Sequence, residues 1–219
     1  KMCKELSYNE DETLHFLSYK HYLPHLKHTE KAQQIGLIHL SGAITGSKSR
    51  SRSSDIAVAS EMELLFERAI FNPAIRAIVL RVDSGGGEVF ASEVIRRAVQ
   101  KARERGKPVV VSMGSVAASG AYWISSQASY IFASPFTITG SIGVYAVSPN
   151  LHSLLKEKLG ITSDGVSVLE DAKNPLEPLD AEDEKKMNLS IGATYNTFLQ
   201  TVVSGRGMDL KDVAPIAEG

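Results

Sequence analysis

The sequence predicts an α/β domain built around a mostly parallel sheet. Apolar runs of strand length alternate with helical segments from about residue 35 to about residue 168. The strand runs are continuously apolar, which is typical of parallel strands covered by helices. Two strand-to-helix junctions are rich in glycine and other small residues. In a parallel sheet, both junctions fall at the carboxyl edge of the strands, where functional sites form.

The first predicted strand covers residues 35–40 and is preceded by a polar segment, 1–34, that we interpret as an arm or inter-domain connector. A basic, serine-rich run follows at 47–54. We interpret it as a surface loop rather than a nucleic-acid patch, because no aromatic residues interleave and the formal net charge is −1. Asp55 is then predicted to cap a helix that ends before Pro73. The apolar positions of this helix are Ile56, Ala59, Leu64, Leu65 and Ala69.

A buried strand is predicted at 75–82, followed by the run Asp83-Ser84-Gly85-Gly86-Gly87 and a helix that starts near Glu88. One side of this helix carries Phe90, Ala91, Val94, Ile95, Ala98 and Val99. The next strand, 109–113, opens on a small-residue turn and a helix that holds Ser119 and Trp123. The remaining predicted elements are a strand at 130–133, the segment 139–144, a helix at 151–159, a strand at 161–168, an acidic loop at 170–184, and helices to about 204 and at 210–217.

Composition excludes several classes of protein. A single cysteine, Cys3, excludes an internal disulfide, and the near-zero net charge predicts no attraction to nucleic acid. No stretch approaches the roughly 18 apolar residues of a membrane span, and the first residues lack the apolar core of a secretory signal. We therefore expect the chain itself to be soluble, with one domain at 35–219, and we expect no metal and no cofactor.

Ser119 has the surroundings of a nucleophile. Its neighbours Ala117, Ala118, Gly120 and Ala121 are small enough to let a substrate backbone approach the hydroxyl. A helix N-terminus also supplies free N–H groups and partial positive charge. A serine at this position could equally serve as a helix cap.

Glycines at the two junctions can present bare N–H groups to a developing oxyanion. Each such donor is typically worth on the order of 3 to 4 kcal/mol in acyl transfer. A nucleophilic serine also needs a base. No histidine lies between residues 40 and 151, which argues against a Ser-His-Asp triad. The six histidines are His15, His21, His25, His28, His39 and His152.

A neutral lysine is the alternative base. Lowering a lysine pKa from about 10.4 to about 7 costs roughly 4 to 5 kcal/mol and requires burial away from carboxylates. Lys173 is preceded by Glu170 and Asp171, which favour its charged form, and Lys101 and Lys107 belong to the end of a polar helix face. None of the three has the environment that a base requires.

Three motifs in order carry a family resemblance: Asp83 to Gly87, Ala117 to Trp123, and Thr139-Gly140-Ser141-Ile142-Gly143-Val144. From about residue 35 to 219 the chain resembles the signal peptide peptidase A (protease IV) family. The resemblance implies a Clp-protease/crotonase-like fold of repeated ββα units, and a serine peptidase with a Ser/Lys dyad. It implies Ser119 as the nucleophile and Gly86 and Gly120 as oxyanion donors, whereas Gly85 departs from the proline often found there.

The family has short members, with serine and lysine in one domain, and long members, whose amino-terminal half supplies the lysine. In this chain Glu170 stands where short members have the lysine. The chain therefore resembles the carboxyl-terminal half of a long member. This implies little or no activity from the isolated half.

The resemblance further implies an endopeptidase that degrades signal peptide remnants and other small membrane-associated peptides. Its expected partners are peptides, the amino-terminal half and further copies in a homo-oligomer, with no nucleic acid. The expected location is a bacterial inner membrane or a plastid membrane, reached through regions outside this chain. The alternatives are a crotonase-like acyl-CoA-binding domain and a short-form peptidase with an internal lysine. A Clp-type peptidase would need a histidine near Phe132 to Pro135, and the sequence has none there.

Overall fold

The computed structural model describes residues 33–47, 56–147, 151–162 and 180–217. The predicted arm lies outside these residues, except for its last two positions. Most of the basic run 47–54 and most of the predicted strand 161–168 also lie outside them.

The main sheet is parallel throughout. Strands β1 (Gln34–Ser41), β4 (Ile75–Ser84), β5 (Val109–Ala118) and β6 (Tyr130–Phe132) pair in that order, and β7 (Ile138–Gly140) pairs with the end of β5. The connections contain α2 (Ala59–Phe71), α3 (Val89–Glu104) and α4 (Gly120–Ser125). The predicted α/β class with a parallel sheet is confirmed.

A second, two-stranded parallel sheet lies beside the carboxyl end of the first. It consists of β2 (Ala43–Thr45) and β3 (Ile56–Val58), and Gly87 forms a further parallel bridge to Ile44 of β2. Strand β1 thus leads through this small sheet into α2, and β4 passes the Gly87 bridge before α3. This order of strand, short second strand and helix fits the predicted ββα unit.

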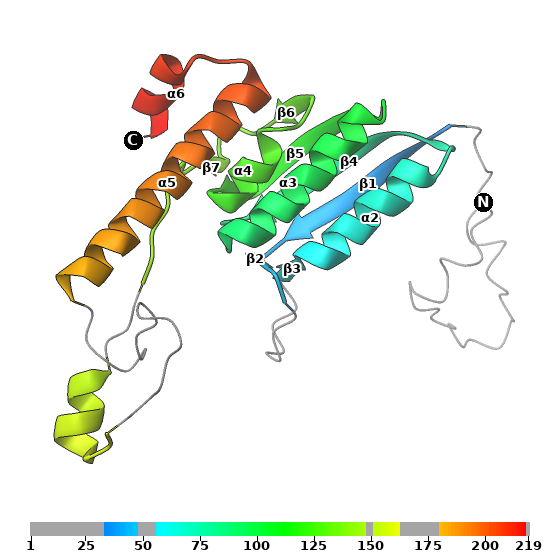
Figure 1. Cartoon of the computed structure of the whole chain (residues 1–219). Coiled ribbons are helices and arrows are strands. Elements are labelled where there is room, and N and C mark those ends of the chain that lie inside the picture. Colours follow the sequence, from blue (N-terminus) through cyan, green and yellow to red (C-terminus); the bar gives the residue numbers. More distant parts are fainter. Residues whose placement is uncertain (1–32, 48–55, 148–150, 163–179, 218–219) are drawn as a thin grey trace, which may run out of the picture. The chain divides into compact units, whose positions relative to one another are not determined.

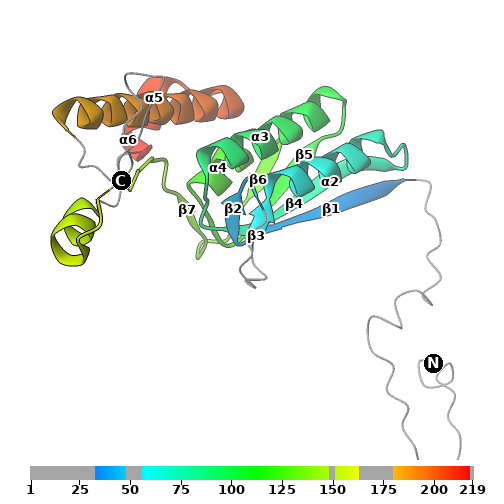
Figure 2. The same cartoon turned by 60° about the horizontal axis from the view of Figure 1, so that its bottom comes forward.

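Helices α2 and α3 lie side by side on one face of the main sheet (Figures 1 and 2). The even-numbered residues of β1 and β4, such as Ile38 and Leu80, point into this core. The odd-numbered residues of β1 face away from it, so Ile35 is 69% exposed. The prediction that helices cover the sheet holds for one face in the described residues.

The predicted helix at Asp55 needs correction. Residues 56–58 form β3, because they pair with β2, and the helix begins at Ala59. Its buried side consists of Ala59, Met62, Phe66, Ala69 and Ile70. Leu64 and Leu65 are exposed instead of buried, because the buried stripe of the helix runs from Met62 through Phe66 to Ala69 and Ile70. In α3, Phe90 is likewise exposed.

The acidic segment before the last helices was also predicted wrongly in part. Helix α5 (Ala181–Arg206) starts inside the expected loop 170–184, because Asp180 caps it. The Asp180 carboxylate accepts hydrogen bonds from the N–H groups of Glu182 and Asp183, and the Asp183 carboxylate accepts one from the Asp180 N–H. This reciprocal capping box outweighs the loop-like composition.

Helix α6 (Leu210–Ala217) and α5 form a small second core with α4. The ring of Trp123 on α4 packs at 4.7 Å from that of Phe198 on α5. Arg206 donates hydrogen bonds to the carbonyls of Ser126 and Ala128, which follow α4. A further helical segment contains Leu154–Lys158. Among the helices that the structure describes, none has the length and apolarity to cross a bilayer.

Trp123 also ties α4 to α3. Its Nε1 donates a hydrogen bond of 3.0 Å to Glu93, whose carboxylate accepts two further bonds from Arg96 and one from Arg97. Burial alone would raise the pKa of Glu93, but the bonds from Arg96, Arg97 and Trp123 outweigh it and lower the pKa to about 2.

This cluster predicts acid sensitivity. The folded-state pKa of Glu93 lies below its ordinary value of 4.5, so its stabilisation is present above pH 4.5 and is lost as pH falls toward 2. The shift corresponds to on the order of 3 kcal/mol at neutral pH. We expect Glu93→Gln to lower the thermal midpoint at pH 7. At pH 3, the difference between the midpoints of the variant and the wild type is expected to be smaller.

Thermal unfolding followed by circular dichroism between pH 7 and pH 3 measures this effect. Glu104→Gln, on the same helix but without the Trp123 contact, serves as the control. An unchanged gap between wild type and Glu93→Gln across that pH range would contradict the assignment.

Candidate active site

Ser119 occupies a strained turn between β5 and α4. Its backbone has φ 52° and ψ −121°, which places a residue with a side chain in the left-handed region. Such a conformation costs of order 1–3 kcal/mol and is concentrated at functional sites. The side chain is not the helix cap: no capping hydrogen bond is formed by Ser119. Ser119 is half-buried, and it does not have the helix-capping role that remained possible from the sequence.

The segment around β7 fixes this turn from one side. The Ser119 N–H donates to the carbonyl of Gly140 at 2.9 Å, and the Thr139 hydroxyl donates to the carbonyl of Ala117 at 2.8 Å. Gly140 and Ser141 both have positive φ, at 79° and 47°. The third sequence motif thus supports the backbone on which Ser119 is placed.

The glycine-rich junction after β4 meets the Ser119 turn at backbone contact distance. A Cβ atom built on Gly86, which has φ +100°, would lie 2.7 Å from the Gly120 nitrogen and 2.9 Å from Ser119 Cβ. A Cβ on Gly120 would collide with the hydroxyl of buried Ser92. Both glycines that sequence analysis assigned to the oxyanion hole therefore lie beside Ser119, where a side chain would not fit.

The two predicted donors differ in what they bind in this structure. Gly120 is the first residue of α4, so its N–H has no carbonyl one turn earlier in the helix. The Gly86 N–H donates a buried hydrogen bond of 3.1 Å to the Ser84 hydroxyl. Gly120 thus offers a donor at the helix N-terminus, while the Gly86 donor is engaged.

An irregularity between β4 and β5 sets the relative position of the two junctions. The pairing passes from Val82 opposite Met113 to Ser84 opposite Ala117, so β5 contains extra residues at this point. The Asp83 carboxylate accepts a hydrogen bond of 3.1 Å from the Val116 N–H and would touch any Cβ on Gly114.

Sequence analysis assigned no role to Asp83, Ser84 or Ser92. The first two directly precede the glycine run, which was the signal that could have identified them. Ser92 lies one turn into α3, where a buried serine is difficult to recognise from the sequence.

The two candidate lysines within the described residues, Lys101 and Lys107, have partners other than Ser119. Lys101 forms an ion pair of 2.9 Å with Glu67, and Lys107 donates to the carbonyls of Ala69 and Asn72. Lys107 precedes β5 and Ser119 follows it; a strand of this length spans roughly 33 Å at about 3.3 Å per residue. Burial, and then the nearby Arg76, lower the pKa of Lys107, but its position excludes contact with Ser119. Lys173 lies outside the described residues.

Two of the six histidines, His39 and His152, lie in the described part of the chain. His39 lies exposed on β1, in register with Arg81 on β4, and β4 separates it from β5. His152 lies in the short helical segment after residue 150. Among the described residues, no group of three His, Cys, Asp or Glu side chains could hold a metal ion.

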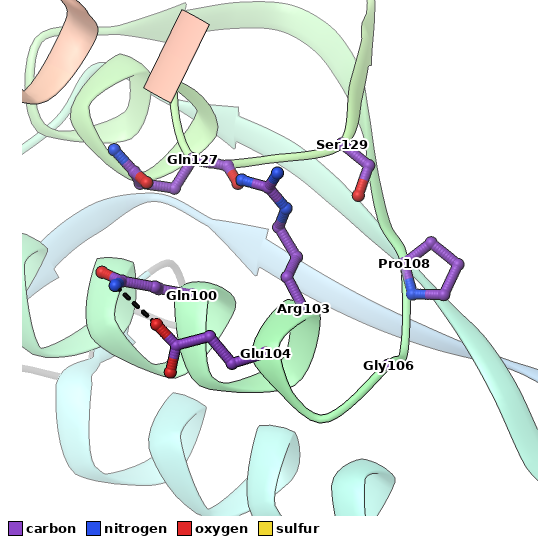
Figure 3. Close-up of a pocket in the computed structure, with 7 residues that line it drawn as sticks. All are labelled: Gln100, Arg103, Glu104, Gly106, Pro108, Gln127 and Ser129. Atoms are coloured by element: carbon purple, nitrogen blue, oxygen red, sulfur yellow. Dashed lines mark hydrogen bonds between the residues drawn. The ribbon is translucent and has the colours of Figure 1, made fainter. Parts of the chain in front are cut away.

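A surface cavity of about 550 Å³ lies at the opposite end of β5 (Figure 3). Gly106, Pro108 and Ser129 contribute to its wall, and Arg103 points across it to donate a hydrogen bond of 2.6 Å to the Gln127 carbonyl. Since Pro108 precedes the first residue of β5, this cavity is separate from the Ser119 turn.

Comparison with protein families matches residues 101–219, including Ser119, to peptidase family S49. The chain belongs to peptidase family S49. Among curated relatives, it is 36% identical to Protease 4 of Haemophilus influenzae over 94% of this chain and 33% of that protein. It is 34% identical to a putative signal peptide peptidase SppA of Enterococcus faecium over 67% of this chain and 43% of that protein.

The chain thus spans about a third to under half of the length of these relatives. Among solved structures, it is similar to a mutant of ClpP1 from Listeria monocytogenes, with 10% identity and a TM-score of 0.48 over 82% of this chain and 77% of that one.

The glycine contacts predict opposite effects for neighbouring substitutions. Gly86→Ala is expected to cost more than about 2 kcal/mol of unfolding free energy, because its φ and its contacts with Gly120 exclude a Cβ. Gly85→Ala is the matched control: nothing lies within 4 Å of its Cβ position, and its φ is not left-handed. That control is expected to gain about 0.4–1 kcal/mol. Chemical denaturation of both variants measures the difference, and equal stabilities would contradict this packing.

Proposed function

We propose that this S49 chain carries the nucleophile and the oxyanion-binding backbone of a serine endopeptidase. The observation that carries the proposal is the contact between two glycine-rich junctions at Ser119. There, a strained turn presents a hydroxyl with no capping role beside the N–H of Gly120. Family membership and the relatives described as proteases support the same reaction class.

In this proposal the Ser119 Oγ attacks the carbonyl carbon of a peptide bond, and its proton passes to a general base. The carbonyl π electrons move onto oxygen, which becomes the oxyanion of a tetrahedral intermediate. The N–H groups of Gly120 and Gly86 then stabilise that charge, each by on the order of 3 to 4 kcal/mol. Collapse of the intermediate expels the amine, which takes the proton from the base, and water later hydrolyses the ester at Ser119.

We propose a lysine as the base, supplied from outside the described residues. Lys101 and Lys107 are engaged by Glu67 and by backbone carbonyls. The half-enzyme arrangement, with the lysine on an amino-terminal S49 domain, agrees with relatives about three times as long as the aligned region. An internal dyad with Lys173 is the competing arrangement.

The proposed substrates are signal peptide remnants and other small peptides at a membrane. The proposed partners are the amino-terminal half of the protein and further copies of it. The relative described as a putative signal peptide peptidase supports this substrate class. Membrane association would come from regions outside the described residues.

Replacing the nucleophile tests the reaction class. In the complete protein, Ser119→Ala is expected to reduce cleavage of a fluorogenic peptide by at least about 10³-fold, because no other group replaces the attacking oxygen. It should also abolish covalent labelling by a fluorophosphonate, with the label mapped by mass spectrometry. Ser115→Ala, at an exposed serine on β5, is the control. Retention of cleavage and labelling in Ser119→Ala would refute the proposal.

The source of the base is tested separately. This chain alone is expected to cleave little, and addition of an amino-terminal S49 half is expected to restore cleavage. Lys101→Ala and Lys107→Ala should remain active in the restored enzyme, since both side chains have structural partners elsewhere. A fully active isolated chain that loses cleavage in Lys173→Ala would replace the half-enzyme with an internal dyad.

A further inference from the structure

One of the two proposed oxyanion donors is occupied in this structure. The Gly86 N–H donates to the Ser84 hydroxyl at 3.1 Å, and both residues are buried, with Ser84 only 2% exposed. The Gly86 carbonyl accepts a bond from the Ile44 N–H at 3.0 Å. Both polar groups of Gly86 are therefore satisfied within the protein.

Ser84 is held firmly at this position. It is the last residue of β4, in register with Ala117 on β5, two residues before Ser119. Gly86 itself lies against the Ser119 turn, since a Cβ built on it would be 2.7 Å from the Gly120 nitrogen and 2.9 Å from Ser119 Cβ. No other hydrogen bond of the Gly86 N–H is found in the described part of the chain.

We propose that Ser84 is a positioning residue that keeps the Gly86 N–H satisfied in the free enzyme and yields it to the oxyanion. This inference rests on the proposed function and assigns Ser84 a part in its oxyanion hole. The Ser84 oxygen acts as a neutral substitute acceptor. It is displaced when the substrate carbonyl oxygen becomes negatively charged beside Gly86 and Gly120.

The strengths of the competing hydrogen bonds favour this exchange. An unpaired buried N–H costs about 1–3 kcal/mol, so a free enzyme without the Ser84 bond would be less stable. A hydrogen bond to an ionised acceptor is roughly twice as strong as one to a neutral acceptor. A neutral ground-state carbonyl therefore gains little by displacing Ser84, whereas the oxyanion gains more. The exchange confines the Gly86 interaction to the transition state, where it accelerates the reaction.

The test compares a transition-state analogue with a ground-state ligand. A peptide boronic acid forms a tetrahedral adduct with a nucleophilic serine and carries a negatively charged oxygen; the corresponding peptide carboxamide binds without that charge. In the complete enzyme, Ser84→Ala removes the competing acceptor. We expect it to tighten both ligands by about five- to tenfold, because neither then has to displace Ser84 from the Gly86 N–H, and to lower the thermal midpoint. Ser84→Thr keeps a hydroxyl and is expected to retain the wild-type affinities for both ligands.

Ser125→Ala is the matched control. Ser125 is also fully buried, and its hydroxyl donates within α4 to the Ala121 carbonyl. Ser125→Ala therefore removes a buried hydrogen bond and leaves the Gly86 N–H unchanged. If Ser84→Ala leaves the affinities for both ligands unchanged, as Ser125→Ala should, or weakens the boronate, the role of Ser84 is refuted.

A crystal structure of the wild-type boronate adduct covers the case in which Ser84→Ala does not fold. The expected adduct is on Ser119, with the Gly86 N–H bonded to the adduct oxygen and the Ser84 bond broken. An adduct on Ser119 with the Ser84–Gly86 bond intact refutes this inference alone. An adduct elsewhere, or none, refutes the proposed function itself.

Discussion

The close approach of three backbone segments is the constraint on which the site depends. A Cβ on Gly87 would overlap the backbone of Ile44, and one on Gly86 would overlap that of Gly120. Glycine at these positions lets β2, the turn after β4 and the start of α4 touch without intervening side chains. Ser119 is thereby placed where main-chain donors can surround a small reacting group, while its own side chain extends from a strained backbone.

This constraint determines how much of the site could be predicted from the sequence. The run Gly85 to Gly87 and the small residues around Ser119 indicated close backbone approach, because glycine and alanine have few other reasons to cluster at strand ends. The hydrogen bond from Gly86 to Ser84 could not be predicted, since a bond between residues two apart forms only in a particular local backbone conformation. A hydroxyl two residues from a glycine looks the same in the sequence whether or not it accepts that bond.

The fold, like the site, could be predicted from the sequence only in part. Strand positions followed from apolar runs, but which side of α2 is buried did not, because Leu64 and Leu65 are as apolar as the residues on the buried side. Met62 and Phe66 therefore fill the core where Leu64 and Leu65 were expected. At α5, Asp180 and its capping box begin the helix inside a segment whose charge favoured a loop. Local composition predicted the elements, and non-local pairing and capping determined their limits.

The anchoring of α4 links these observations to reactivity. A helix of six residues is too short to be stable by itself, so tertiary contacts must hold it. Glu93 holds Trp123 from α3, Phe198 packs on the same ring from α5, and Gly140 accepts the Ser119 N–H from β7. These contacts, from three separate elements, together offset the strain at Ser119. Residues remote from the hydroxyl therefore help determine whether the nucleophile and its donors remain aligned.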